Sequence, residues 1–234
     1  MSDIQPPQSP PPVQRLWLRY AKRSVARFAS HRDFSRVFQR ALRRAGVPMA
    51  YSSGFHPHPR ISYAQAVPTG AASEAEYLEI ALAEKVIPEK LIEALNDSLP
   101  RDFRVLQAVE APGGKLQDKM AASIWMCKVP EETDRRALQA AIAEFLERDE
   151  VLVTRKAKKG DRTFDTRQAA LELQIFPSGM RVLLKHVVPL VRPDDIVRAL
   201  ISINPQLFEL PDVLFDRLSQ GPLLDGHQIG DPLA

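Results

Sequence analysis

The feature that most constrains the fold is an amphipathic segment at residues 31–45. Its apolar residues recur at spacings of three and four, the period of one helix face: Phe34, Val37, Phe38, Ala41, Leu42 and Ala45. Ser30 precedes the segment as an N-cap with Asp33 three residues on, as in a capping box, and Gly46 followed by Pro48 ends it. This pattern predicts a helix that buries its apolar face against another layer.

The segments around this helix have the two-residue alternation of strands. Strands are expected at residues 15–20, 61–67, 76–82 and 103–109, and a second amphipathic helix begins at Pro88. The order strand, helix, strand, strand, helix, strand is that of the split βαβ or ferredoxin-like arrangement. It recurs in the second half, with helices at 134–147 and from Pro193, and strands at 123–129, 151–155, 171–176, 180–187 and 213–218. We therefore expect an α+β fold of two tandem ferredoxin-like halves with antiparallel sheets.

Composition along the chain predicts where these halves begin and end. Residues 1–14 are rich in proline and poor in bulky apolar residues, so we expect a disordered tail there. A basic ferredoxin-like domain is predicted at 15–112, a linker at 113–122, a second such domain at 123–220 and a loose tail at 221–234. The start of the chain lacks the pattern of a secretory signal, and no apolar run has the length of a membrane span. The expected location is the cytoplasm, with no membrane partner.

Charge is distributed very unevenly. Residues 15–60 hold eleven Arg or Lys against one acidic residue, Asp33, a net +10, whereas the whole chain is only +3. Crowded like charges repel, so this segment predicts a partner with negative charge.

The basic residues suggest where that partner binds. Arginines follow helical spacing on the polar side of the 31–45 helix, and arginine makes bidentate contacts to phosphates. Aromatic residues just downstream are of the kind that stacks on unpaired bases in single-stranded RNA readers. A second basic patch around Gly160 includes Arg155 and resembles a hairpin tip. The candidate RNA-binding residues are Arg32, Arg36, Arg40, Arg43, Arg44, Tyr51, Phe55, His56, His58, Arg60, Lys156, Lys158 and Lys159.

Three histidines leave other chemistry open. His31, His56 and His58 could converge as metal ligands or as a general acid and base, with His31 and His58 as the catalytic candidates. Cysteines and further histidines that would complete a zinc set are missing nearby, so no metal and no cofactor are expected. The single cysteine, Cys127, lies in an apolar run and is interpreted as a buried, inert thiol. The sequence also lacks phosphate-loop, nucleophile-elbow, zinc-protease and three-cysteine motifs.

Several long motifs resemble those of one bacterial family. Residues 27–80 contain Ser-His-x-Asp, Arg-Ala-Leu-Arg-Arg-Ala and Tyr-Ser-x-Gly-Phe-x-Pro-His-Pro, and the likeness extends to about residue 220. The segment resembles the signature of radical-SAM-linked proteins, here in stand-alone form, a family with no assigned reaction that is typically encoded near an E/G-type ribonuclease. The resemblance implies a separate radical S-adenosylmethionine enzyme as partner and RNA-related work.

These observations favour an RNA-binding accessory module for tRNA or rRNA that has no catalytic activity of its own. One alternative is a metal-independent RNA-processing or RNA-modifying enzyme that uses a histidine as general acid or base. Another is a protein–protein adaptor whose arginine face docks on the radical S-adenosylmethionine partner.

Overall fold

The computed structural model describes residues 8–156 and 160–234 and has a mixed α+β fold whose sheets are mainly antiparallel. The chain divides into two compact units, which are treated separately below. Unit 1 runs to Lys119 and includes Leu233–Ala234, and unit 2 is Met120–Pro232, so the division falls within residues 113–122. No helix among the described residues is long and apolar enough to cross a membrane.

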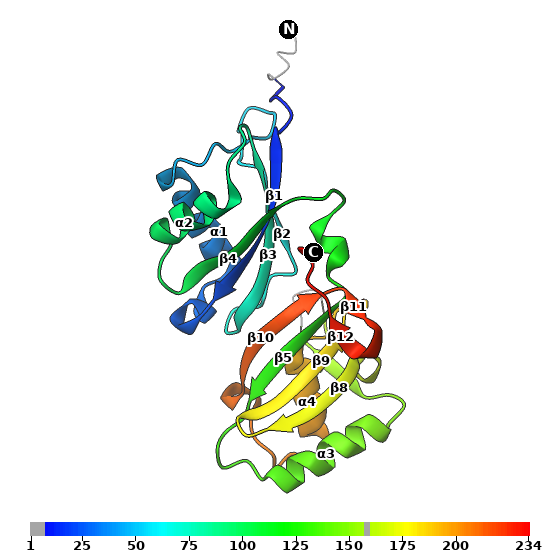
Figure 1. Ribbon diagram of the computed structural model, residues 1–234. Helices are drawn as coiled ribbons and strands as arrows, with labels where there is room; N and C mark the ends of the chain where they lie inside the picture. Colours follow the sequence, from blue (N-terminus) through cyan, green and yellow to red (C-terminus); the bar gives the residue numbers. More distant parts are fainter. Residues whose placement is uncertain (1–7, 157–159) are drawn as a thin grey trace. The chain divides into compact units, whose positions relative to one another are not determined.

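Unit 1 consists of one antiparallel sheet with two helices on one face (Figure 1). The strand order is β4-β1-β3-β2. In chain order, the elements are β1 (Gln14–Lys22), η1 (Ser24–Phe28), α1 (His31–Arg44), β2 (Ile61–Ala64), β3 (Ala72–Leu82), α2 (Pro88–Ser98), β4 (Phe103–Glu110) and η2 (Leu116–Lys119).

The core of unit 1 lies between this sheet and its helices. Phe34 and Phe38 of α1 are buried, and the ring of Phe34 stacks on Tyr20 of β1 with a centroid distance of 4.3 Å. Leu91 and Leu95 provide the buried face of α2. The periodicity of residues 31–45 therefore predicts the buried face of α1 correctly.

Local hydrogen bonds fix both ends of α1. The Ser30 hydroxyl accepts from the Asp33 amide, and the Asp33 carboxylate accepts from the Ser30 amide, so the predicted capping box is confirmed. At the other end, Gly46 adopts a φ of +65°, which glycine tolerates far better than other residues, and Val47 N–H donates to the Leu42 carbonyl.

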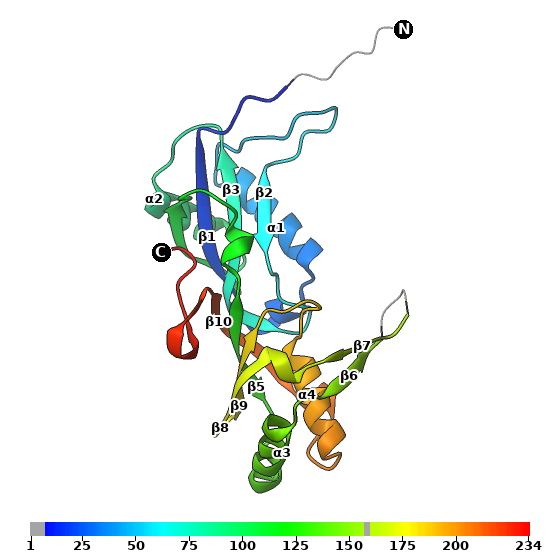
Figure 2. The ribbon, with the colours of Figure 1, turned by 90° about the vertical axis from the view of Figure 1, so that its right-hand side faces the viewer.

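Unit 2 has a second antiparallel sheet, with the order β10-β5-β9-β8, and α3 and α4 on one face (Figure 2). Phe145 of α3 and Leu200 of α4 are fully buried. The elements are β5 (Ala122–Lys128), α3 (Arg135–Glu147), β6 (Leu152–Arg155), β7 (Arg162–Asp165), η3 (Arg167–Ala169), β8 (Ala170–Phe176), β9 (Gly179–Lys185), α4 (Pro193–Ile203), η4 (Leu210–Asp212), β10 (Leu214–Gly221), β11 (Leu223–Leu224), η5 (Asp225–His227) and β12 (Gln228–Ile229).

The structure differs from the sequence prediction at three places. The predicted tail 221–234 contains the β11–β12 hairpin, and Gly221 lies so close to the Gly230 carbonyl that a Cβ would come within 2.2 Å of its oxygen. Strand β7, which pairs with β6, was not predicted. In the predicted tail 1–14, β1 already includes Gln14, whose buried amide bonds to the Val86 backbone and to Glu110, while residues 1–7 lie outside the described part.

Replacing Phe38 with alanine is expected to destabilise the protein by about 3–5 kcal/mol, because it leaves a cavity in the core beside α1. Urea unfolding followed by circular dichroism measures the loss. Phe28→Ala is the matched control, because this ring is 66% exposed, and the change should stay within about 0.5 kcal/mol. Equal effects of the two substitutions would contradict the assigned core.

Candidate functional site

The exposed face of α1 carries an arginine row, which we define as Arg32, Arg36, Arg40, Arg43 and Arg44. All five side chains are exposed, and they lie outside the buried apolar face of the same helix. Within the described part of the chain, no carboxylate oxygen lies within 4 Å of their guanidinium nitrogens. Arg60, a half-buried candidate just before β2, likewise has no ion pair there. These six charges are therefore available to a ligand.

Two other basic residues of the 15–60 segment are paired with carboxylates. Arg15 pairs with Glu79 at 2.5 Å, and Arg23 makes two hydrogen bonds to Glu74, at 2.6 and 2.5 Å. These bonds raise the pKa of Arg23 above its ordinary value. Both carboxylates belong to β3, outside the basic segment, so the net +10 of residues 15–60 overstates the free charge. Five arginines of the segment for which the structure describes no ion pair lie together on α1.

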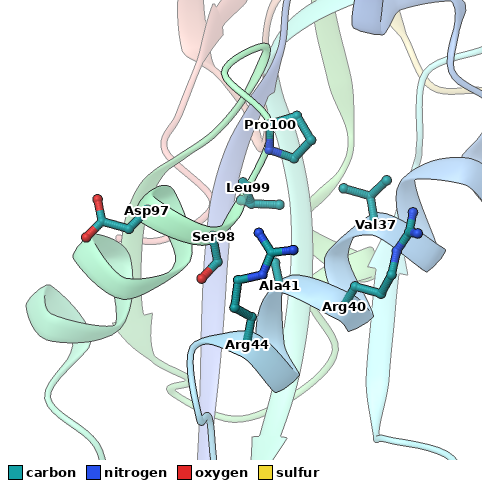
Figure 3. A pocket seen from close by; sticks show the side chains of 8 residues that line it. All are labelled: Val37, Arg40, Ala41, Arg44, Asp97, Ser98, Leu99 and Pro100. Atoms are coloured by element: carbon teal, nitrogen blue, oxygen red, sulfur yellow. The ribbon is translucent and has the colours of Figure 1, made fainter.

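Two hollows flank the arginine row. The first, of about 310 Å³, lies between α1 and the end of α2 (Figure 3). Figure 3 shows the Arg44 side chain reaching toward Ser98 and Leu99, whereas the Arg40 guanidinium lies farther along α1, near Val37. The second, of about 430 Å³, is lined by Asp33, Arg36, Val37, Gln39, Arg40 and Arg43. Arg40 and Val37 border both, so the helix surface offers two adjoining recesses edged by guanidinium groups.

The segment between α1 and β2 forms a hydrogen-bonded loop, here called the 51–60 loop. Tyr51 pairs with Pro59 as an isolated bridge, the Ser52 amide donates to the His58 carbonyl at 2.9 Å, and the His58 amide donates to the Ser52 hydroxyl at 3.0 Å. Tyr51 is 43% exposed and Phe55 is 72% exposed, and His56 and His58 are exposed too. Pro57 and Pro59, which cannot donate backbone hydrogen bonds to a neighbouring strand, lie in this loop.

The structure does not bring the three candidate histidines together. His31 begins α1 and meets the edge of the Tyr63 ring with a centroid distance of 4.6 Å, whereas His56 and His58 belong to the 51–60 loop. Tyr63 in turn donates its hydroxyl hydrogen to Ser35 at 3.3 Å. Among the residues that the structure describes, no three His, Cys, Asp or Glu side chains form a group that could hold a metal ion.

The residues of the second basic patch have different structural settings. Arg155 is structural: its guanidinium forms an ion pair with the fully buried carboxylate of Asp195, donates to the Leu190 carbonyl and lies 4.8 Å from the centre of the Phe164 ring. Lys156 is exposed beyond the end of β6. Lys158 and Lys159 lie outside the described residues. Figure 2 shows the β6–β7 hairpin projecting from unit 2.

A buried polar cluster in unit 2 went unpredicted. The His186 Nδ1 atom lies 2.8 Å from the Met120 carbonyl, so it carries the hydrogen, and Nε2 accepts from the Ser123 hydroxyl at 3.0 Å. Ser123 accepts from the Trp125 indole at 2.9 Å. Burial lowers the pKa of His186, and the charge of Arg217 lowers it further. The cluster joins residues up to 66 positions apart, a separation that local patterns do not reveal.

Cys127 is completely buried, and burial raises the pKa of its thiol well above the ordinary value. The expected burial of this thiol is confirmed, and a raised thiol pKa disfavours the reactive thiolate.

The comparison with protein families covers most of both units. The model of the family described as "Uncharacterized protein conserved in bacteria (DUF2344)" matches residues 15–195. The chain belongs to the DUF2344 family. The matched range contains the arginine row and the 51–60 loop.

Other comparisons add little to the DUF2344 assignment. No curated protein matches the sequence. A solved structure described as "Crystal Structure of an Unknown Protein from Galdieria sulphuraria" is similar at 14% identity and a TM-score of 0.26, covering 87% of this chain and 96% of that one. A similarity at this level carries no argument about fold or function.

Removing the Arg155 side chain should destabilise this DUF2344 protein by about 3–5 kcal/mol, because it leaves the Asp195 carboxylate buried without its partner. Urea unfolding of Arg155→Ala tests this, with Lys156→Ala as the control that should change stability by less than about 0.5 kcal/mol. If Arg155→Ala were as stable as the wild type, the assigned structural role would be wrong.

Acidification should weaken the fold through His186. Its pKa is lowered in the folded protein, so the unfolded chain binds the proton more readily, and stability falls as pH drops through the unfolded value of about 6.5. Urea midpoints measured between about pH 7.5 and about pH 5.5 reveal the slope. His186→Gln should be less stable at the upper pH yet lose less on acidification. An unchanged slope in this variant would argue against the mechanism.

Proposed function

We propose that this protein is an RNA-binding accessory protein in which the arginine row of α1 holds the phosphates of tRNA or rRNA. The single observation that carries the proposal is the presence of five exposed guanidinium groups on one helix with no carboxylate partner among the described residues.

The energetic argument concerns repulsion along the helix. Arg32, Arg36 and Arg40 follow each other at intervals of four residues, as do Arg40 and Arg44. Like charges at this spacing destabilise a helix by a few tenths of a kcal/mol per pair. A strand of phosphates laid along the row neutralises these charges and accepts bidentate hydrogen bonds from the planar guanidinium groups. Arginines four residues apart rise by about 6 Å along the axis, so a run of phosphates can be contacted in turn.

The partner and architecture belong to the same proposal. The sequence resemblance supports a separate radical S-adenosylmethionine enzyme as partner, with the accessory protein presenting RNA to it in the cytoplasm. In unit 1, the strand order β4-β1-β3-β2, with α1 and α2 on one face, supports the ferredoxin-like interpretation. In unit 2, the order β10-β5-β9-β8 supports it likewise, with the β6–β7 hairpin as an insertion.

Reversing two charges of the row should abolish most RNA binding. Arg36→Glu with Arg40→Glu is expected to weaken binding of bulk tRNA at least tenfold and to lower the log-log salt slope by about 0.7–0.9 for each phosphate that the variant no longer binds. Filter binding across a salt series measures both. The control is Arg136→Glu with Lys185→Glu, an equal charge reversal at exposed positions of unit 2, which should retain most of the affinity.

Filter binding, incubation with RNA and partner capture together separate the alternatives. Affinity and slope unchanged in Arg36→Glu/Arg40→Glu would refute the proposal. Discrete RNA products that vanish with His58→Ala would establish the enzyme instead. Capture of the radical S-adenosylmethionine partner that survives ribonuclease and is lost with the double reversal would establish the adaptor.

A further inference from the structure

The 51–60 loop is held in place from both sides. The two sides of the loop are joined by the hydrogen bonds between Ser52 and His58. At its base, the Arg60 amide donates to the Ala50 carbonyl at 2.9 Å. Ser9 adds contacts from the preceding segment, because its amide donates to the Ser53 hydroxyl at 2.9 Å and its hydroxyl donates to the Ser52 carbonyl at 3.1 Å. The loop therefore presents its side chains from a fixed base, which reduces the ordering cost of binding.

The composition of the loop is unusual for an exposed surface. Its rings are Tyr51, Phe55, His56 and His58, all exposed, and it contains no aliphatic side chain other than its two prolines. Gly54 has a φ of +123°, a conformation that other residues rarely adopt, and it turns the chain just before Phe55. Flat aromatic rings of this kind are the side chains on which nucleobases stack.

Along the chain, no acidic residue lies between the arginine row and this loop. The sequence has no Asp or Glu from residue 34 to residue 73, so the charges nearest to the rings along the chain are Arg43 and Arg44 before the loop and Arg60 at its end. The connection is short, since α1 ends at Arg44 and the loop begins at Tyr51. Figure 2 shows this connection extending beyond the start of β2. A polyanion that follows the arginine row toward the C-terminal end of α1 reaches the rings without meeting a repelling carboxylate of this segment.

We infer that the RNA is single-stranded where it passes the 51–60 loop and that the Phe55 ring stacks on an unpaired base. This inference rests on the proposed function. The ring is free to stack because it is 72% exposed. Within a duplex both faces of each base are covered by neighbouring bases, so only an unpaired base can accept the ring. Stacking works with any base, and the loop thus selects for strand state rather than sequence.

The test compares strand states. A labelled oligoribonucleotide of roughly 16 nucleotides is titrated alone and annealed to its complement, with wild type, Phe55→Ala, Phe55→Leu and Phe55→Trp. Phe55→Ala and Phe55→Leu should bind the single strand about tenfold more weakly with the same salt slope, and bind the duplex as the wild type does. Phe55→Trp should retain the affinity, because it keeps an aromatic face. Phe28→Ala, the exposed ring of η1, is the control and should change neither.

The outcomes distinguish this inference from the proposed function. Suppose that Arg36→Glu/Arg40→Glu loses affinity for both single-stranded and duplex RNA but Phe55→Ala loses affinity for neither. The inference is then overturned, and the proposed phosphate contacts stand. Equal losses on single strand and duplex with Phe55→Ala also overturn it. If Phe55→Leu binds like wild type, the side chain acts by apolar contact and stacking is refuted. If the double reversal changes nothing, the proposed function itself fails. Unchanged urea midpoints for the Phe55 variants show that folding is unaffected.

Discussion

The packing of α1 on the sheet of unit 1 is the constraint on which the candidate site depends. Phe34 stacks on Tyr20 and contacts Phe38 and Phe103, and these rings fix the rotation of the helix about its axis. Once one face is buried, the positions three and four residues apart on the other face must point outward. The orientation of the arginine row is thus a result of the core, and the hydrogen bonds at Ser30 and Gly46 determine where the row begins and ends.

Much of unit 1 could be predicted from the sequence because its signals are local. The capping box, the apolar period of α1 and the alternation of β1 and β3 each involve residues a few positions apart, and the structure places these elements within a few residues of expectation. The β11–β12 hairpin was missed because strands of two residues have no measurable period. Strand β7 has four residues, only one of them buried, and was missed for a similar reason.

The candidate site shows the same division. The arginine row is a local pattern and was recognised as such, but charge alone does not show which arginines are already paired. Arg155 seemed part of a basic tip, and only folding reveals that Asp195, forty residues later, holds it. Arg15 and Arg23 were counted toward the excess charge, although β3 supplies a carboxylate to each. Long-range pairs of this kind are what single-sequence patterns lack.

Asp33 is the one acidic residue among the basic residues of the 15–60 segment, and the capping box occupies it. Its carboxylate accepts hydrogen bonds from the Ser30 amide and hydroxyl, which lower its pKa, and the charge of Arg36 lowers that pKa further. Guanidinium groups keep their proton throughout the accessible range. The Asp33 carboxylate therefore stays ionised near neutrality. Ionic strength, rather than acidity, is the variable that regulates how strongly these groups attract an anion.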